Sequence, residues 1–202
     1  MTLPDRFYVT GTDTDVGKTV ACAALCAAGG YDYLKPIQSG VPGDSETVAA
    51  LSGVRTWPER WRLRRPASPH AAAGDEGIRI ALSELTLPPA PRLVVEGVGG
   101  WLAPLATQPA LWQSDLVRAL GLPVLVVARS GLGTLNHTLL TLRALRADGA
   151  IVLGVLLTGP AHAENERDLP RLSGVPVLGR LPRVDDPAAE LPALTAAVRH
   201  LM

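Results

Sequence analysis

Short apolar runs alternate with helix-like stretches along this chain. Residues Phe7–Thr10 form the first run, and after a glycine-rich loop the small apolar residues 20–28 are typical of a buried helix. Between residues 134 and 148, leucines recur at spacings of three and four, which predicts a crossover helix that ends before Gly149. Three later runs of mostly Val and Leu have the near-continuous pattern of strands covered on both faces: 93–96, 123–128 and 151–157.

This alternation predicts a single α/β domain over residues 1–202. Strands that alternate with helices form right-handed βαβ units, which gives a mainly parallel β-sheet with helices on both faces. Ligands of such sheets bind beyond the carboxyl ends of the strands. Candidate functional residues are therefore those that follow the apolar runs.

Composition narrows the classes of function. The chain has 202 residues, and its nineteen Lys and Arg balance nineteen Asp and Glu, so no overall field attracts nucleic acid or an anionic membrane. Its first residues lack the charged-then-apolar pattern of a signal peptide, and no run of about 18 residues is free of polar side chains. We expect a cytoplasmic protein that binds neither nucleic acid nor a membrane.

Two local features have a simple structural interpretation. Cys22 and Cys26 lie four residues apart on the predicted helix, where helical geometry disfavours a disulfide, and no histidine stands at metal-ligand spacing beside them. We expect ordinary core thiols. Between residues 55 and 65, five arginines alternate with Trp57 and Trp61, as in some nucleic-acid sites. We expect instead a solvated surface loop, Trp57–Ala73, anchored by the two tryptophans.

The strongest chemical signal is a phosphate-binding loop. Gly17, Lys18 and Thr19 stand between a strand and a helix, where backbone N–H groups and the helix N-terminus hold phosphate oxygens. The lysine neutralises charge, and the threonine hydroxyl reaches Mg²⁺. Five residues separate Gly11 from Gly17, one more than in the usual GxxxxGK[ST] spacing. The fold is therefore predicted to be of the P-loop NTPase type.

Two further charged residues lie where they would complete such a site. Glu96 closes an apolar run before a glycine-rich turn, the position at which P-loop enzymes place a metal-binding carboxylate. Lys35 lies in another apolar run, where burial without an anionic partner is costly. The alternatives are a carboxylate that caps the turn and a lysine that extends from a strand edge into solvent.

Five sequence blocks stand in order along the chain: GTDTDVGKT at 11–19, YLKPIQSG at 33–40, SPH at 68–70, EGVGGW at 96–101 and GLGTLNH at 131–137. Together they resemble the dethiobiotin synthetase family, the ATP-dependent carboxylases of biotin biosynthesis, in which the longer phosphate loop is the usual form. The resemblance implies that 7,8-diaminononanoate takes up CO₂ as a carbamate, that ATP phosphorylates the carbamate to a carbamic-phosphoric anhydride, and that the second amine closes the ring. Dethiobiotin, ADP and phosphate would be the products.

The resemblance also implies roles by matching position. Lys18 and Lys35 would balance charge on the γ-phosphate and the carbamate, while Thr12 and Ser39 would hold the diamine and the carbamate; the lysines and Thr12 are the expected catalytic residues. Mg²⁺ would be bound by Thr19, Asp44 and Glu96, with Asp44 favoured over the nearby Glu46 because it opens a helix-like stretch. The remaining nucleotide contacts would come from Asp15, Val16, Gly17, Lys18, Thr19, Val20, Asp44, Glu96, Gly97, Val98, Gly99, Leu181, Pro182 and Arg183.

The block at 131–137 implies a site for the far carboxylate of the diamine. The substrate-binding groups there would be Gly133, Thr134, Leu135 and Asn136, at the start of the crossover helix. In the family this helix belongs to the neighbouring subunit, so the resemblance implies a homodimer with shared active sites. Simple capping of the helix by Thr134 or Asn136 is the alternative.

The chain departs from the family pattern at Thr158 and Gly159. Many family members read adenine there through an Asn-Asp pair, so a preference for ATP over other nucleoside triphosphates is not implied here. Two other classes of protein remain alternatives. A switch or partition-type ATPase would usually carry a second lysine early in the loop, and an amidoligase would usually need an ammonia source for which 202 residues leave no room.

Overall fold

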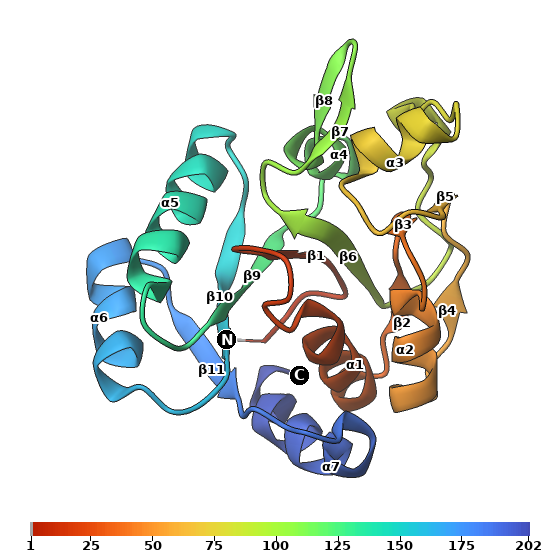
Figure 1. The fold of residues 1–202 in the computed structure, drawn as a ribbon. Helices are drawn as coiled ribbons and strands as arrows, with labels where there is room; N and C mark the ends of the chain where they lie inside the picture. Colours follow the sequence, from red (N-terminus) through yellow and green to blue (C-terminus); the bar gives the residue numbers. More distant parts are fainter. Residues whose placement is uncertain (1) are drawn as a thin grey trace.

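The computed structural model describes residues 2–202 and places a seven-stranded sheet at the centre of the molecule (Figure 1). The strand order is β11-β10-β9-β1-β6-β2-β4, and every pairing within this sheet is parallel. The predicted P-loop α/β architecture is therefore observed. The strands are β1 (Arg6–Gly11), β2 (Asp32–Leu34), β4 (Thr56–Trp57), β6 (Leu93–Gly100), β9 (Val124–Arg129), β10 (Val152–Thr158) and β11 (Val177–Leu181).

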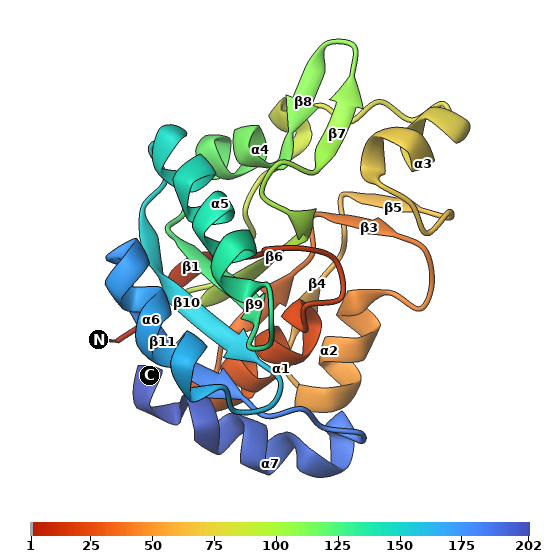
Figure 2. The ribbon, with the colours of Figure 1, turned by 60° about the vertical axis from the view of Figure 1, so that its left-hand side comes forward.

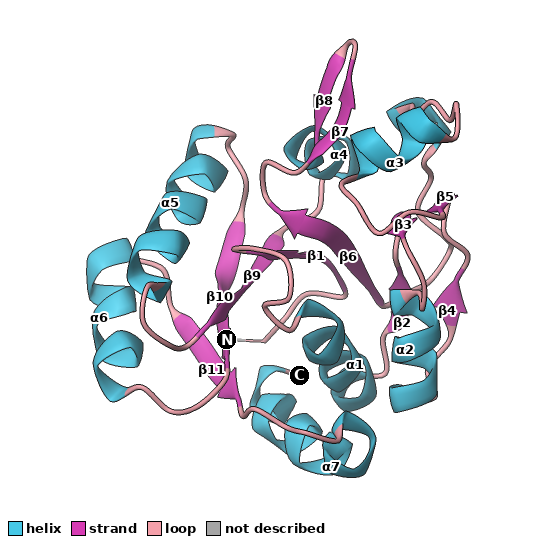
Figure 3. Ribbon diagram, in the orientation of Figure 1, coloured by secondary structure: helices cyan, strands magenta, loops and turns pink. Residues whose placement is uncertain are grey.

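Helices cover both faces of this sheet (Figure 3). Successive side chains of a strand point to opposite faces, so Phe7 and Val9 pack into one core and Tyr8 into the other. The first core is closed by α1 (Lys18–Gly29), α2 (Asp44–Ser52) and α7 (Pro187–Val198). The second core is closed by α4 (Gln113–Leu120), α5 (Thr134–Ala147) and α6 (Ala163–Ser173).

Short elements lie outside the main sheet. A parallel pair joins β3 (Ile37–Ser39) to β5 (Trp61–Leu63), and an antiparallel hairpin joins β7 (Pro104–Thr107) to β8 (Ala110–Trp112). The hairpin extends away from the body of the molecule, beyond α4 (Figure 2). The remaining elements are α3 (Pro69–Asp75) and the 3₁₀ turns Leu82–Glu84 and Arg199–Leu201.

The expectation of a solvated loop over Trp57–Ala73 is wrong. The stretch holds the end of β4, all of β5 and most of α3, and Trp61 and Leu63 are buried in the core. Alternation of apolar Trp61 and Leu63 with exposed Arg62 is the pattern of a half-buried strand, which the run of arginines hides. Four of the arginines form ion pairs with nearby carboxylates: Arg60 with Glu84, Arg62 with Glu46, Arg64 with Glu76 and Arg65 with Asp75.

The expectation of a glycine-rich turn after Glu96 is wrong, because β6 continues through these glycines to Gly100. The cysteine prediction is confirmed, since Cys22 and Cys26 are buried free thiols on α1. Among the described residues, no helix has both the length and the apolar character needed to cross a membrane.

Candidate active site

The phosphate loop joins the carboxyl end of β1 to α1, as the sequence predicted. Lys18, the first residue of α1, is buried, and its ammonium donates to the carbonyl of Asp13 at 3.0 Å. Asp15 has a positive φ of 55°, and it is the one non-glycine residue in the described part of the chain with this backbone conformation. Backbone strain of this kind collects at functional sites, where the surrounding structure holds it in place.

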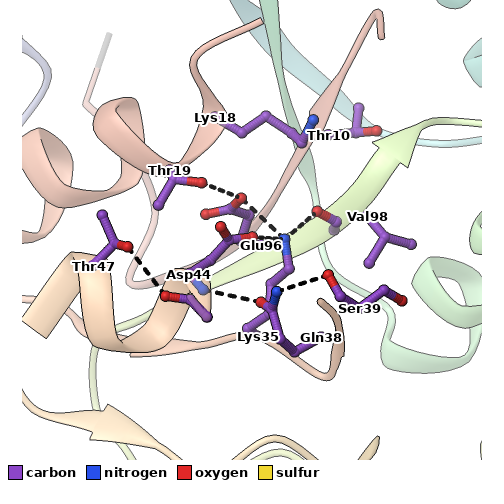
Figure 4. Close-up of polar contacts among 12 residues, drawn as sticks. Thr10, Lys18, Thr19, Lys35, Gln38, Ser39, Asp44, Thr47, Glu96 and Val98 are labelled. Atoms are coloured by element: carbon purple, nitrogen blue, oxygen red, sulfur yellow. Dashed lines mark hydrogen bonds and ion pairs between the residues drawn. The ribbon is translucent and has the colours of Figure 1, made fainter. Parts of the chain in front are cut away.

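Glu96, within β6, lies at the centre of a polar cluster beside the carboxyl ends of β1 and β2 (Figure 4). Its carboxylate is buried and accepts hydrogen bonds from Thr19 (3.0 Å), Tyr33 (2.8 Å) and Lys35 (3.1 Å). Three donors satisfy a charged group that would otherwise be costly to bury. Because Thr19 follows the phosphate-loop lysine, these bonds fix the carboxylate beside the phosphate loop.

Lys35 links the other charged groups of the cluster. It follows β2 directly, and its ammonium lies 2.5 Å from the Asp44 carboxylate and 3.0 Å from the carbonyl oxygen of Gly97. Burial lowers the pKa of Lys35, but the carboxylates of Glu96 and Asp44 outweigh that effect, so the pKa lies above its usual range. The side chain is therefore a fixed positive charge at neutral pH.

The cluster contains every lysine of the protein. The sequence has two lysines, Lys18 and Lys35, and all its other basic side chains apart from histidine are arginines. Burial is the main cause that lowers the pKa of Lys18, and the nearby positive charge of Lys35 adds to it, against the opposing effect of Glu96. An anion placed between the two ammonium groups would relieve both the burial of charge and their mutual repulsion.

A cleft of about 890 Å³ opens above this cluster. The phosphate loop and β6 form one side, and the segments around Val41 and Pro66 form another. Ser39 belongs to the wall, and its hydroxyl is buried and has no hydrogen-bond partner within residues 2–202. Further lining residues are Asp15, Gly17, Lys18, Thr19, Val20, Lys35, Gln38, Asp44, Glu96, Val98 and Gly99.

The donor set suits magnesium. Thr19, Asp44 and Glu96 offer one hydroxyl and two carboxylates around the same small volume, all hard oxygen donors. Three such donors leave coordination positions of an octahedral ion open for phosphate oxygens and water. Within residues 2–202, no group of three His, Cys, Asp or Glu gathers. One or two carboxylates combined with substrate phosphates is the usual magnesium arrangement in ATP-dependent enzymes.

Comparison with known proteins decides between the classes of P-loop protein. A family model described as an AAA domain matches residues 5–190. An ATP-dependent dethiobiotin synthetase BioD from Sphingopyxis alaskensis is 48% identical over 181 residues, which cover 89% of this chain and 88% of that protein. A protein of the same description from Brucella ovis is 46% identical over 92% of this chain and 89% of its own length. The chain belongs to the dethiobiotin synthetase family.

A solved structure of a ParA family ATPase from Chlorobium tepidum resembles the chain with a TM-score of 0.57. The match covers 98% of this chain and 92% of the ATPase, but the sequences are only 11% identical, so this likeness concerns the fold. The predictions of a P-loop fold, of the synthetase family and of an enzyme are confirmed, and the relatives favour the synthetase over the partition-type ATPase that was the alternative.

Some residues that the synthetase resemblance suggested lie away from the cleft wall. Val16 is buried, and its carbonyl accepts a bond from Thr158 at 2.7 Å. Gly97 contributes its carbonyl to Lys35, while the backbone N–H of Thr12 is bonded to β9 through the carbonyl of Val127 at 3.0 Å. Such groups offer backbone or side-chain atoms near the phosphate loop without lining the cleft itself.

The start of α5 is capped by Gly133 and not by a side chain, so capping by Thr134 or Asn136 is wrong. The Thr134 hydroxyl pairs instead with Thr138 at 3.2 Å, and the Thr134 N–H is bonded to the carbonyl of Gly131. Residues 133–136 do not line the cleft. The side chain of Leu132, just before them, is fully exposed.

The strand end that replaces the usual base-reading pair of the synthetases lies beside the phosphate loop. The hydroxyl of Thr158 donates a hydrogen bond to the carbonyl of Val16. Gly159 has φ +117°, and a Cβ there would lie 2.8 Å from the Ser130 hydroxyl, so a side chain does not fit this backbone. The following strand end, Leu181, accepts a bond from the N–H of Gly159 at 3.0 Å, which brings residues 181–183 to the same edge of the sheet.

Several residues that support this site could not be found from the sequence pattern. Gln38 accepts a bond from the backbone N–H of Asp44 at 3.0 Å and so holds the start of α2. Tyr33 bonds Glu96, and Arg129 donates to the carbonyl of Thr14 in the phosphate loop at 3.1 Å. For Tyr33 alone the sequence holds a signal: it stands two residues before Lys35, and residues two apart on a strand share one face.

Proposed function

We propose that this enzyme forms dethiobiotin from 7,8-diaminononanoate, CO₂ and MgATP in the cytoplasm, acting as a single domain over residues 1–202. Membership in the dethiobiotin synthetase family makes it an ATP-dependent enzyme. The observation that carries the assignment of the site is the contact of Lys35 with Glu96 and Asp44 next to the phosphate loop. This one buried cation lies between the phosphate loop, where we place the nucleotide, and the part of the cleft wall that holds Ser39, where we place the carbamate.

The reaction needs positioning more than acid or base groups. One amine of the diamine adds to CO₂ and loses a proton, which gives a carbamate. A carbamate oxygen then takes the γ-phosphoryl group from ATP and releases ADP. The second amine attacks the carbamoyl carbon, loses a proton and expels phosphate, which closes the ring. Negative charge collects on the transferred phosphoryl group, where Lys18 and Lys35 hold their ammonium groups in place before the reaction.

Around these charges the cleft offers further contacts. Bound through Thr19, Asp44 and Glu96, magnesium would neutralise charge on the β- and γ-phosphates. Ser39, together with Thr12, would hold the carbamate and the amine. The apolar segments around Val41 and Pro66 would keep water from the anhydride. The adenine end would lie near residues 181–183, past Thr158.

We assign the far carboxylate of the diamine to residues 133–136 of a second subunit. Apart from that of Thr134, which is bonded to Gly131, the backbone N–H groups at the start of α5 suit an anion, and within one subunit they do not line the cleft. Large apolar side chains are exposed near this helix and at the β7–β8 hairpin: Leu102, Trp112, Leu132 and Leu140. Such side chains favour an interface, and a homodimer with shared sites would cover them.

The experiment is a coupled measurement of phosphate release and product. Purified protein receives MgATP and bicarbonate, with and without 7,8-diaminononanoate, and dethiobiotin is followed by mass spectrometry in the same samples. We expect phosphate release that depends on the diamine and matches dethiobiotin one to one. Phosphate release that ignores the diamine and yields no product would contradict the proposal and favour a switch ATPase.

A further inference from the structure

The pairing of β1 with β6 is interrupted at the active site. The two strands run in register from Arg6 opposite Leu93 to Val9 opposite Glu96, and the next pair is Gly11 opposite Gly100. One residue of β1, Thr10, therefore faces three residues of β6, which bulges away from its neighbour. The bulge comprises residues 97–99, and two of them, Val98 and Gly99, belong to the wall of the cleft after Glu96.

The side chain of Gln113 fills the gap that this bulge opens. Its carboxamide oxygen accepts from the backbone N–H of Val98 at 2.6 Å, and its NH₂ group donates to the Thr10 hydroxyl at 3.0 Å and to the Gly100 carbonyl at 2.9 Å. Gln113 is 1% exposed, so these bonds exclude water. A carboxamide has the donors and the acceptor of a peptide group, and here it replaces the missing strand partner.

Gln113 is itself held firmly. It is the first residue of α4, and its backbone N–H donates to the carbonyl of Ala103 at 2.9 Å. Gly97 packs directly on its side chain, since a Cβ on Gly97 would lie 2.5 Å from the Gln113 oxygen. The bulge therefore has little freedom to move toward or away from β1.

These contacts reach both halves of the active site. Thr10 immediately precedes the phosphate loop, and Val98 follows Glu96 by two residues; both appear in Figure 4. The carbonyl of Gly97, between Glu96 and Val98, accepts a bond from Lys35. A single amide thus spans the distance between the phosphate loop and the segment that carries Glu96.

We propose that Gln113 is a positioning residue, whose amide holds the bulged wall of β6 at a set distance from the phosphate loop. It touches no reacting group, and it acts through Val98, Gly100 and Thr10. The inference rests on the proposed function, because the loss it predicts is a loss of turnover. Misplacement of reacting groups by about 1 Å costs up to about 100-fold in rate, so loss of the Gln113 amide should lower kcat strongly.

The test uses Gln113→Met, which keeps the length of the side chain and removes all three bonds, and Gln113→Glu, which keeps the acceptor for Val98 and loses the NH₂ donors. Val117→Ala is the matched control, since Val117 is buried on the same helix, faces the core and lies off the cleft wall. Turnover at saturating MgATP and diamine is measured well below each melting temperature. Amide exchange over residues 97–100 is measured on the same proteins.

For Gln113→Met we expect kcat to fall by about 100-fold, and for Gln113→Glu by less, with faster exchange confined to residues 97–100. Val117→Ala is expected to lower the melting temperature with less than a threefold change in kcat. Loss of kcat in proportion to melting temperature across all three variants would overturn the inference. If Gln113→Met does not fold, a Gln113→Glu protein with unchanged kcat and unchanged exchange would overturn it equally. Should the unmodified protein make no dethiobiotin, the proposed function fails, and the exchange data with MgATP binding still decide the role of Gln113.

Discussion

The ammonium of Lys35 lies 2.5 Å from the carboxylate of Asp44, which is the first residue of α2. The same ammonium lies 3.1 Å from the carboxylate of Glu96 on β6. One cation therefore holds together two acidic groups of different elements, one at the start of α2 and one within β6. Removing the ammonium alone would leave buried negative charge without a partner, which costs more stability than replacing all three charged side chains with apolar ones.

Lys35→Ala should lower the melting temperature, because it leaves the buried Glu96 carboxylate without its cation, but should keep the fold at assay temperature and remove most of the turnover. The loss removes charge stabilisation at the phosphoryl group and not core packing, so we expect kcat to fall by at least about 100-fold. Phosphate and dethiobiotin assays measure the effect, and circular dichroism checks the fold. Arg92→Ala is the control, because Arg92 pairs with Asp5 and stacks on Tyr31 away from the cleft. Near-normal turnover in the Lys35 variant would assign catalysis elsewhere.

Tyr33→Phe should weaken the response to magnesium. It removes the hydrogen bond that orients one oxygen of Glu96 and leaves the rest of the ring in place. Loss of such outer contacts typically costs about 10-fold or more in metal affinity, so the magnesium concentration for half-maximal activity should rise by about that factor. Tyr31→Phe is the control, since its hydroxyl bonds the carbonyl of Pro4, remote from the cleft. Equal effects of the two changes would contradict a role for Tyr33 at Glu96.

The nucleotide base should matter little. Thr158 spends its hydroxyl on the phosphate loop, and Gly159 has no side chain, so neither offers an amide or carboxylate to the base edge. We expect kcat/KM values for ATP, GTP and CTP within about tenfold of one another, because such discrimination depends on a site built to pair with polar groups of the substrate. The measurement is dethiobiotin formation with each nucleotide. A strong preference for ATP would require a base-reading contact elsewhere, with residues 181–183 as the first place to look.

Much of this architecture follows from the sequence pattern, because buried parallel strands and a strand-loop-helix phosphate site have strong local signals. The supporting groups do not. Gln113 reaches Thr10 across 103 positions and Tyr33 reaches Glu96 across 63, and no periodicity reports pairs so far apart in the chain. Trp61 was missed for another reason: the arginines around it suggest a solvated loop, whereas tertiary packing buries it in a short strand.

A homodimer should form through the face that carries Leu140 on α5. Size-exclusion chromatography with light scattering should give a mass of about 42 kDa, twice the 21.2 kDa of one chain. Leu140→Glu places a charge on the exposed apolar surface and should give monomers with little synthetase activity. Leu172→Glu, at a similarly exposed leucine on α6, should leave both properties unchanged. An active monomer would refute shared active sites.

Both lysines of the chain lie in the cleft, although lysine is usually a surface residue. Amine-directed reagents, which label most proteins at many surface positions, therefore meet only two side-chain amines here, both of them buried, and Glu96 and Asp44 hold that of Lys35 in its unreactive protonated form. Burial lowers the pKa of Lys18, so labelling of this side chain and its suppression by a bound nucleotide can be followed by peptide mass alone, and a nonspecific reagent becomes a selective probe of occupancy. The same feature means that immobilisation or fluorescent tagging through lysine would inactivate the enzyme instead of merely decorating its surface.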